Sequence, residues 1–132
     1  MVKYSFLLYS AVSSVNLYDV PIAISSIKIT KFFVRCPNAH KMLIVVIGGL
    51  NKNVHITNST AVYNVLSLPM TNSPNYSLDY VSDNNKPDCV FNPTVQVSQL
   101  DITVLTDDGF TGTTNLTDIQ PTNNAFIEIE IL

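Results

Sequence analysis

Short apolar runs rich in Val, Ile, Phe and Tyr recur along the whole chain, and Pro, Gly, Asn or Asp residues bound them. No long window spaces its apolar residues by three and four positions, as an amphipathic helix would. β-Branched and aromatic residues favour strands, and the residues between the runs favour turns. About eight or nine such runs predict an all-β fold, a two-sheet antiparallel β-sandwich. Long connections favour a minimal single jelly roll over an up-and-down barrel, within a single domain over residues 1–132.

We expect strands at residues 3–12, 22–34, 41–47, 54–57, 61–68, 76–81, 95–105 and 125–132, with chain breaks at 58–60 and 92–93. The alternation slips at Ser25 and Ser26 and again between Val97 and Leu100, which predicts a bulge at each place. The run at 41–47 is apolar without alternation, as is typical of a strand covered on both faces. Residues 58–60 form the polar tip of an expected hairpin.

The charged fraction is only 13%, and Asn, Ser and Thr supply most of the polarity. Neutral polar side chains cost less to desolvate than ionic ones, so this composition favours a component of an assembly. The net charge is −3, and the seven basic residues are scattered, which excludes nucleic-acid binding as the main role. The apolar run at 42–50 is too short to span a membrane, and residues 1–15 are expected to form a strand rather than a signal peptide.

The sequence offers little that resembles a catalytic site. His40 and His55 are the candidates for a general base near neutral pH, but no nucleophile motif accompanies them. We therefore expect two surface or turn histidines and no enzymatic activity. Cys36 and Cys89 have neither metal nor redox spacing, and free thiols are favoured over a disulfide.

Acidic residues suggest no bound ion either. Asp107 and Asp108, with Asp101 nearby, match no calcium-loop consensus. Glu128 and Glu130 alternate with isoleucines and are expected to form the solvated face of the last strand, where charge also discourages edge pairing. No metal and no cofactor is predicted.

The C-terminal third of the chain resembles a known family. Residues 100–109 (LDITVLTDDG) are followed by a polar loop and by residues 124–131 (NAFIEIEI). This arrangement resembles the closing strands of small jelly-roll capsid proteins from large double-stranded DNA viruses and virophage-like elements. In those proteins an acidic-Gly turn ends one strand, and a loop leads to a final strand of the Phe-x-Leu-Glu-Ile kind. Such jelly rolls are usually longer, so this chain would be a near bare roll, and the resemblance leaves penton and other minor positions open.

The resemblance implies a minor or penton-like capsid component of the virion that acts through subunit contacts, without catalysis. Its partners would be other capsid proteins and further copies of itself, in a homo-oligomer such as a pentamer. The polar loops at 69–74, 82–88 and 110–122 are the expected contact surfaces. The contact residues we select in and beside them are Asn72, Asn75, Asn84, Asn85, Phe110, Thr113 and Asn115.

A carbohydrate- or receptor-binding β-sandwich, of the fibre-head or adhesin type, is the alternative. Such a module needs an aromatic platform, which Tyr63, Tyr76 and Tyr80 would have to supply together. Tyrosines in an all-β domain usually pack within strands instead. The capsid hypothesis is therefore preferred.

Overall fold

The computed structural model describes residues 2–17, 19–35, 38–70, 77–121 and 125–132, and these ranges contain strands but no helix. The strands are β1 (Val2–Leu8), β2 (Val12–Asn16), β3 (Ile22–Arg35), β4 (Met42–Ile47), β5 (Asn53–Thr57), β6 (Thr60–Asn64), β7 (Leu66–Pro69), β8 (Ser77–Val81), β9 (Cys89–Val97), β10 (Gln99–Thr106), β11 (Thr114–Asn115) and β12 (Ala125–Ile131). The predicted all-β class is confirmed.

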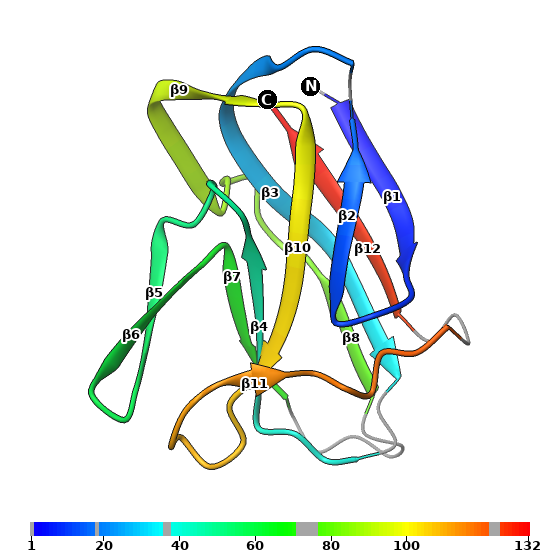
Figure 1. The fold of residues 1–132 in the computed structure, drawn as a ribbon, viewed down its shortest axis with the longest axis vertical. Helices are drawn as coiled ribbons and strands as arrows, with labels where there is room; N and C mark the ends of the chain where they lie inside the picture. Colours follow the sequence, from blue (N-terminus) through cyan, green and yellow to red (C-terminus); the bar gives the residue numbers. More distant parts are fainter. Residues whose placement is uncertain (1, 18, 36–37, 71–76, 122–124) are drawn as a thin grey trace.

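Two antiparallel sheets pack face to face (Figure 1). Sheet A has the order β1-β12-β3-β8, and β9 pairs with the other half of the long strand β3. Sheet B has the order β11-β10-β4-β7, and β2 pairs with β10. The strands β5 and β6 form a separate hairpin. The two-sheet antiparallel β-sandwich is therefore confirmed.

The chain crosses between the sheets in a jelly-roll pattern. It passes from β1 in sheet A to β2 in sheet B, returns to β3, and crosses again to β4. It stays in sheet B from β4 to β7, with the β5–β6 hairpin inserted between them. It then crosses to β8 and β9, to β10, and finally to β12. This alternation builds two five-stranded sheets with the connectivity of a single jelly roll.

The core lies between the sheets and follows the alternation of the sequence. Ile127, Ile129 and Ile131 point inward from β12, and each is at most 5% exposed. Glu128 and Glu130 point outward, as predicted. However, β12 lies between β1 and β3, so these glutamates stand on a central strand rather than on an edge.

The predicted features of β3 and β4 are confirmed. The pairing of β3 with β9 shifts register between Ile24 and Ser26, where the sequence predicted a bulge. β4 lies between β10 and β7, and Ile44 is buried although it faces away from the central core. The apolar run without alternation thus marks a strand covered on both sides.

Two predicted strands are each divided in the structure. Residues 3–12 end as β1 at Leu8, and β2 starts at Val12, where the Ser10 hydroxyl accepts a hydrogen bond from the Val12 amide at 3.3 Å. This local bond competes with continued strand pairing. Residues 95–105 divide at Ser98, whose carbonyl oxygen accepts a bond from the Leu17 amide at 2.8 Å. The break in alternation beside Val97 therefore marks the place where the chain passes from sheet A to sheet B, and the prediction of a bulge there is wrong.

The chain break predicted at Asn92–Pro93 is also wrong. These residues lie inside β9 and are joined by a cis peptide bond. β9 pairs with β3 on either side of them, at Val90 and at Val95, but not between. A proline is accommodated because no ladder hydrogen bond is required from its nitrogen there.

The expected hairpin is confirmed, although its second strand ends earlier than predicted. β6 stops at Asn64, and the Val65 amide donates to the Val45 carbonyl oxygen at 2.9 Å, which leads the chain into β7. Asn58 and Ser59 form the turn with φ values of 46° and 61°. Two left-handed residues in a two-residue loop match the twist of a hairpin, and glycine is favoured at the second position.

Replacing Ser59 by Gly should stabilise the protein. Glycine adopts positive φ without the steric cost that a serine side chain incurs, so Ser59→Gly should raise the free energy of unfolding by about 1 kcal/mol. Urea unfolding followed by circular dichroism measures the change. Thr60→Gly, one residue later and inside β6, is the control and should lower stability; equal effects from both variants would contradict the argument.

Candidate interaction surfaces

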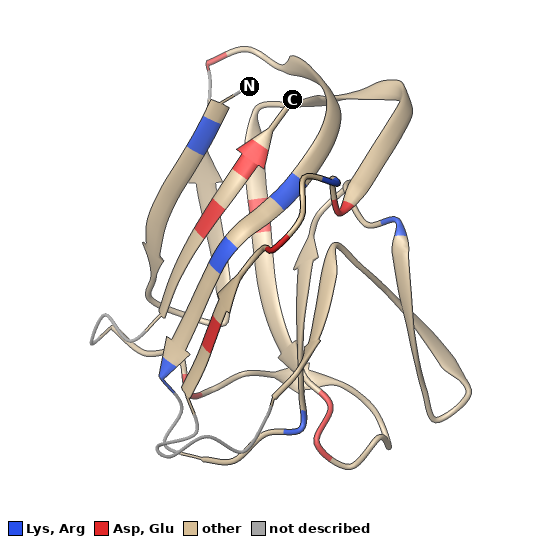
Figure 2. Ribbon diagram, turned by 180° about the vertical axis from the view of Figure 1, so that it is seen from behind, with Lys and Arg blue, Asp and Glu red and all other residues tan. Residues whose placement is uncertain are grey.

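The outer face of sheet A carries charges of both signs in cross-strand rows (Figure 2). Glu130 lies between Lys3 and Lys28 in one row, and Glu128 lies opposite Lys31 in the next. Lys3 Nζ is 4.0 Å from Glu130 Oε2, and the Lys3 side chain is 56% exposed. An exposed pair at this distance contributes less than about 1 kcal/mol. These charges therefore shape the surface more than they stabilise the fold.

An open depression of about 460 Å³ lies among these rows. Its lining adds Thr30, Asn84 and Asn85 to the lysines and glutamates. Lys28 is only 7% exposed, and its Nζ donates a hydrogen bond to the Asn84 carbonyl oxygen. The Thr30 hydroxyl donates to Glu128 Oε1 at 2.8 Å. The depression thus offers hydrogen-bond donors, acceptors and both signs of charge.

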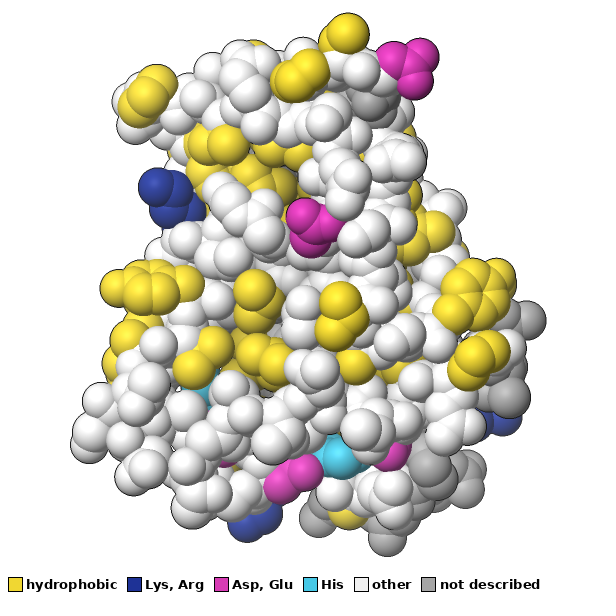
Figure 3. Space-filling model, in the orientation of Figure 1, with side chains coloured by type: hydrophobic (Ala, Val, Ile, Leu, Met, Phe, Trp, Pro, Cys, Tyr) yellow, Lys and Arg dark blue, Asp and Glu magenta, His cyan; other side chains and the backbone are white. Residues whose placement is uncertain are grey.

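The outer face of sheet B has a different character. β10 turns Asp101, Thr103 and Leu105 outward. Asp101 Oδ1 accepts bonds from Gln99 Nε2 at 2.6 Å and Ser14 Oγ at 2.8 Å, and these bonds lower the pKa of that carboxyl. Figure 3 shows this side of the molecule with separate hydrophobic patches among uncharged side chains and few charges.

The β5–β6 hairpin packs against the outer side of sheet B. β6 contacts β4, where Ile44 alternates away from the core yet is 0% exposed. His55 Nε2 lies 2.8 Å from Asp107 Oδ2, just after the end of β10. The Asp107 side chain is completely buried and that of His55 is 13% exposed. The hairpin is therefore anchored by a buried polar pair.

Burial raises the pKa of Asp107, but other contacts outweigh it. The hydrogen bond and the charge of His55, with the nearby Thr57 hydroxyl and Gly112 amide, hold this pKa below its ordinary value, although neither Asp107 Oδ1 nor the Thr57 hydroxyl forms a hydrogen bond with a described residue. The carboxylate is thus kept ionised under the hairpin. An ionised acceptor strengthens the bond that His55 donates.

The hairpin turns its apolar face to solvent. Val54 pairs with Tyr63 and Ile56 with Ala61, so these four side chains share one face, which we call the hairpin patch. Val54, Ile56 and Tyr63 are 48%, 62% and 60% exposed. The opposite face carries His55, the 3% exposed Thr57 and the fully buried Asn64. Apart from Val62, which pairs with His55, polar residues face inward and apolar residues outward, the reverse of the usual arrangement.

A second group of exposed apolar side chains flanks the turn from β1 to β2, with Leu7 on the outer face of sheet A, paired with Phe126, and Val12 on the outer face of sheet B, paired with Thr103. Leu7, Tyr9 and Val12, which we call the corner patch, are 40%, 52% and 56% exposed. The hairpin and the β1–β2 turn lie at opposite edges of the sandwich in both ribbon views (Figures 1 and 2). The two longest stretches of the sequence without Asp, Glu, Lys or Arg, residues 4–18 and 53–78, contain these two patches. Six of the twelve exposed large apolar side chains of the described residues lie at these two edges.

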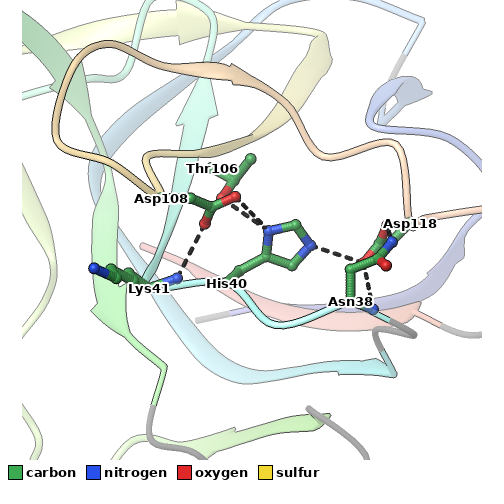
Figure 4. Close-up of polar contacts among 6 residues, drawn as sticks. All are labelled: Asn38, His40, Lys41, Thr106, Asp108 and Asp118. Atoms are coloured by element: carbon green, nitrogen blue, oxygen red, sulfur yellow. Dashed lines mark hydrogen bonds and ion pairs between the residues drawn. The ribbon is translucent and has the colours of Figure 1, made fainter.

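A histidine cluster lies at the loop end of the roll (Figure 4). His40, just before β4, has Nδ1 2.8 Å from Asp108 Oδ2 and Nε2 2.7 Å from Asp118 Oδ2. The Asn38 side chain donates to Asp118 Oδ1 at 3.1 Å, and the Lys41 amide donates to Asp108 Oδ1 at 3.0 Å. Three connections, those before β4, after β10 and after β11, are thereby tied together.

The two carboxylates determine the protonation of His40. Burial lowers the pKa of the imidazole, but the hydrogen bonds and charges of Asp108 and Asp118 outweigh it, so the pKa lies above 6.5. Burial raises the pKa of Asp108, and bonds from Thr106, His40 and the Lys41 amide bring it below its ordinary value. The cluster therefore favours an imidazolium between two carboxylates.

The selected contact residues fall into two separate groups. Asn84 and Asn85 line the depression on sheet A. Phe110, Thr113 and Asn115 lie in the connection that follows β10; Phe110 is 50% exposed, and its ring lies 5.9 Å from Lys41 Nζ. Asn72 and Asn75 lie outside the described residues.

Of the two expected placements, surface or turn, His40 takes the turn, just before β4, and neither ring is freely exposed. The side chains of His40 and His55 are only 10% and 13% exposed, and each contacts an aspartate. The tyrosine platform is not assembled either: Tyr63 is exposed on the hairpin, whereas Tyr80 packs against the core. Tyr76 lies outside the described residues.

The hairpin patch and the histidine cluster were missed by sequence reasoning. The sequence predicted a hairpin here but not which of its faces turns outward, and the aspartates that contact His40 follow it by 68 and 78 positions. The absence of charge across residues 53–78 was the one available signal for an unusual surface.

Among the described residues, no group of three or more His, Cys, Asp and Glu side chains is placed to hold a metal ion. Cys89 is a buried free thiol, and Cys36 lies outside the described ranges. The described part of the chain contains no helix that would cross a membrane. No protein-family model matches the chain, and neither does any curated protein.

Proposed function

We propose that this chain is a viral structural protein, a minor or penton-like capsid component of the virion that acts through contacts between subunits. The observation that carries the proposal is the pair of unlike apolar patches at opposite edges of a jelly roll. Jelly rolls are a recurrent architecture of capsid proteins. Unlike patches on opposite edges favour head-to-tail contacts, which close into a ring when the rotation allows it.

The composition of the patches supports burial against a neighbouring copy. Neither patch contains a charged side chain, so its burial carries no cost of desolvating an ion. Ile56 and Tyr63, the most exposed members of the hairpin patch, gain most from being covered. The reversed orientation of the hairpin would be explained by such a contact, because its apolar face then becomes part of an interface.

Light scattering behind a sizing column, over a series of protein concentrations, tests the proposal. We expect a closed oligomer larger than a dimer, such as a pentamer. Ile56→Asp in the hairpin patch and Val12→Asp in the corner patch should each give monomers. Either change places a charge in the contact between the hairpin patch of one copy and the corner patch of the next. Val81→Asp, at a residue that is 60% exposed outside both patches, is the control and should leave the oligomer intact.

A monomer at every concentration would count against self-assembly and would move the test to mixtures with other capsid proteins. A dimer that only Ile56→Asp dissociates would show that two hairpin patches meet symmetrically, which would overturn the head-to-tail arrangement. Circular dichroism of each variant verifies that it remains folded.

The alternative function is a carbohydrate- or receptor-binding module, and the depression on sheet A is the observation that favours it. Asn84, Asn85 and Thr30 provide neutral hydrogen-bonding groups beside the charged rows. Sugars are recognised by such groups, although usually with an aromatic platform, and Val81 is the apolar residue of this lining. Binding to a glycan array that is lost in Asn84→Ala but kept in Ile56→Asp would favour this function over assembly.

A further inference from the structure

Both ring nitrogens of His40 face carboxylate oxygens. Nδ1 meets Asp108 Oδ2 at 2.8 Å, and Nε2 meets Asp118 Oδ2 at 2.7 Å. Ionised carboxylates only accept hydrogen bonds, so both nitrogens must donate, and only the protonated imidazole has two N–H donors. A neutral ring keeps one donor and must give up one of the two carboxylates.

The two carboxylates differ in their access to water. The Asp118 side chain is 5% exposed, whereas that of Asp108 is 43% exposed. Losing one donor costs a buried carboxylate more than an exposed one, because water can replace the donor only at the exposed carboxylate. The remaining proton of a neutral ring therefore belongs on Nε2, facing Asp118, and Nδ1 becomes an acceptor.

Thr106 supplies a donor for that acceptor. Its hydroxyl oxygen lies 2.6 Å from Asp108 Oδ1 and 3.2 Å from His40 Nδ1, and the residue is 5% exposed. A hydroxyl carries one hydrogen, so it serves the carboxylate or the ring nitrogen at a given time. When Nδ1 loses its proton, the hydroxyl can turn from Asp108 to the ring, and Asp108 then loses two of its donors together.

We propose that His40 is a proton-operated clasp: its protonated ring holds the segment 108–113 through Asp108, and loss of the ring proton releases that segment, while Asp118 stays bound to the ring and Asp107 to His55. The charged groups that face the ring are Asp108 and Asp118. Lys41, the next residue in the chain, contacts Asp108 through its backbone amide, which donates a hydrogen bond to Asp108 Oδ1 at 3.0 Å. The released segment carries Phe110, whose ring lies under the Lys41 ammonium. The exposure of an apolar ring at this end of the roll then depends on pH.

The direction of the pH dependence follows because the segment is held only while the His40 ring is protonated. The pKa of His40 in the folded protein lies above 6.5. Stabilisation by the clasp is therefore fully present below pH 6.5 and is lost as the pH rises through the folded pKa. The segment that carries Asp108 is therefore expected to be released at neutral to alkaline pH.

Nuclear magnetic resonance of protein with ¹⁵N-labelled histidine tests the clasp directly. A pH titration of the wild-type protein should give a His40 pKa above 6.5 and, above that pKa, a neutral ring protonated on Nε2. The amides of residues 109–113 should shift with the same pKa, and those of residues 116–120 much less. Asp108→Asn, at a partly exposed position, should lower the His40 pKa and abolish the shift of residues 109–113.

Thr106→Val provides a second test, because it removes the hydroxyl that replaces the carboxylate while keeping the shape of the side chain. It should raise the His40 pKa, since the neutral ring loses its donor at Nδ1. A neutral ring protonated on Nδ1, or a pH-dependent shift confined to residues 116–120, would show that Asp118 is released instead and would overturn the proposal. A His40 pKa at or below 6.5 in the wild-type protein would overturn it as well.

Discussion

Phe32→Ala should lower the free energy of unfolding by about 3–5 kcal/mol, the largest single effect we expect in this chain. Phe32 lies on β3 in the middle of sheet A, between Ile127 of β12 and Tyr80 of β8, and is 0% exposed. Removing its ring leaves a cavity that neighbours on two paired strands cannot fill. The loss is large compared with the stability of a typical domain, so the variant should be largely unfolded at moderate temperature.

Phe33→Ala is the matched control for this prediction. Phe33 is the next residue of the same strand, but it points to the outer face of sheet A and is only partly buried. Its truncation should cost about 1 kcal/mol. The chain has no tryptophan, so urea unfolding is best followed by circular dichroism and tyrosine fluorescence. Equal losses in the two variants would mean that the inward and outward faces of β3 are assigned wrongly.

Asp107→Ala should release the β5–β6 hairpin from sheet B. The variant leaves the His55 ring beneath the hairpin without its acceptor, at a cost of about 1–3 kcal/mol. Hydrogen exchange should accelerate at the amides of residues 53–64 and stay slow in β3 and β12. Ile44, which is buried on the outer side of sheet B, should become accessible to solvent in this variant.

Asp101→Ala, on the exposed face of the same strand β10, is the control and should change stability by less than about 0.5 kcal/mol. The Asp107 pKa is lowered in the folded protein, so its contribution is present above its unfolded value of 3.8 and is lost as the pH falls through the folded pKa. The hairpin of the wild-type protein should therefore detach in strong acid, a step that Asp107→Ala should not show. Unchanged exchange at residues 53–64 in Asp107→Ala would refute this anchoring.

Alternation within single strands allowed much of the fold to be predicted. The isoleucines of β12 and the register shift near Ser25 follow from local patterns, because alternation decides which face each side chain takes. The same patterns do not specify neighbours. The crossing at Ser98 was therefore mistaken for a bulge within one strand, since a change of sheet and a bulge both shift the phase of alternation.

The candidate surfaces were less predictable because they depend on contacts between distant segments. Alternation placed Val54 and Ile56 on one face of the hairpin, but the buried Asp107 reverses which face turns inward. The two carboxylates of the His40 cluster come from segments that follow β10, and no pattern near His40 in the sequence indicates that they contact it. The loop at 82–88 was correctly recognised as a polar connection, whereas the one predicted at 110–122 also contains β11 and buries Leu116 and Ile119 in the core; the role of both in contacts stays a prediction.

The central position of β12 in sheet A bears on how the protein is made. β1 is synthesised before the other described strands, its pairing partner is β12, and β12 also completes one side of β3. Until residue 131 has been synthesised, both strands expose unpaired edges with apolar inner faces. Early-synthesised strands that wait for a late partner are open to pairing with other chains. Translation speed and chaperone supply should therefore govern the soluble yield of this protein more strongly than its final stability does.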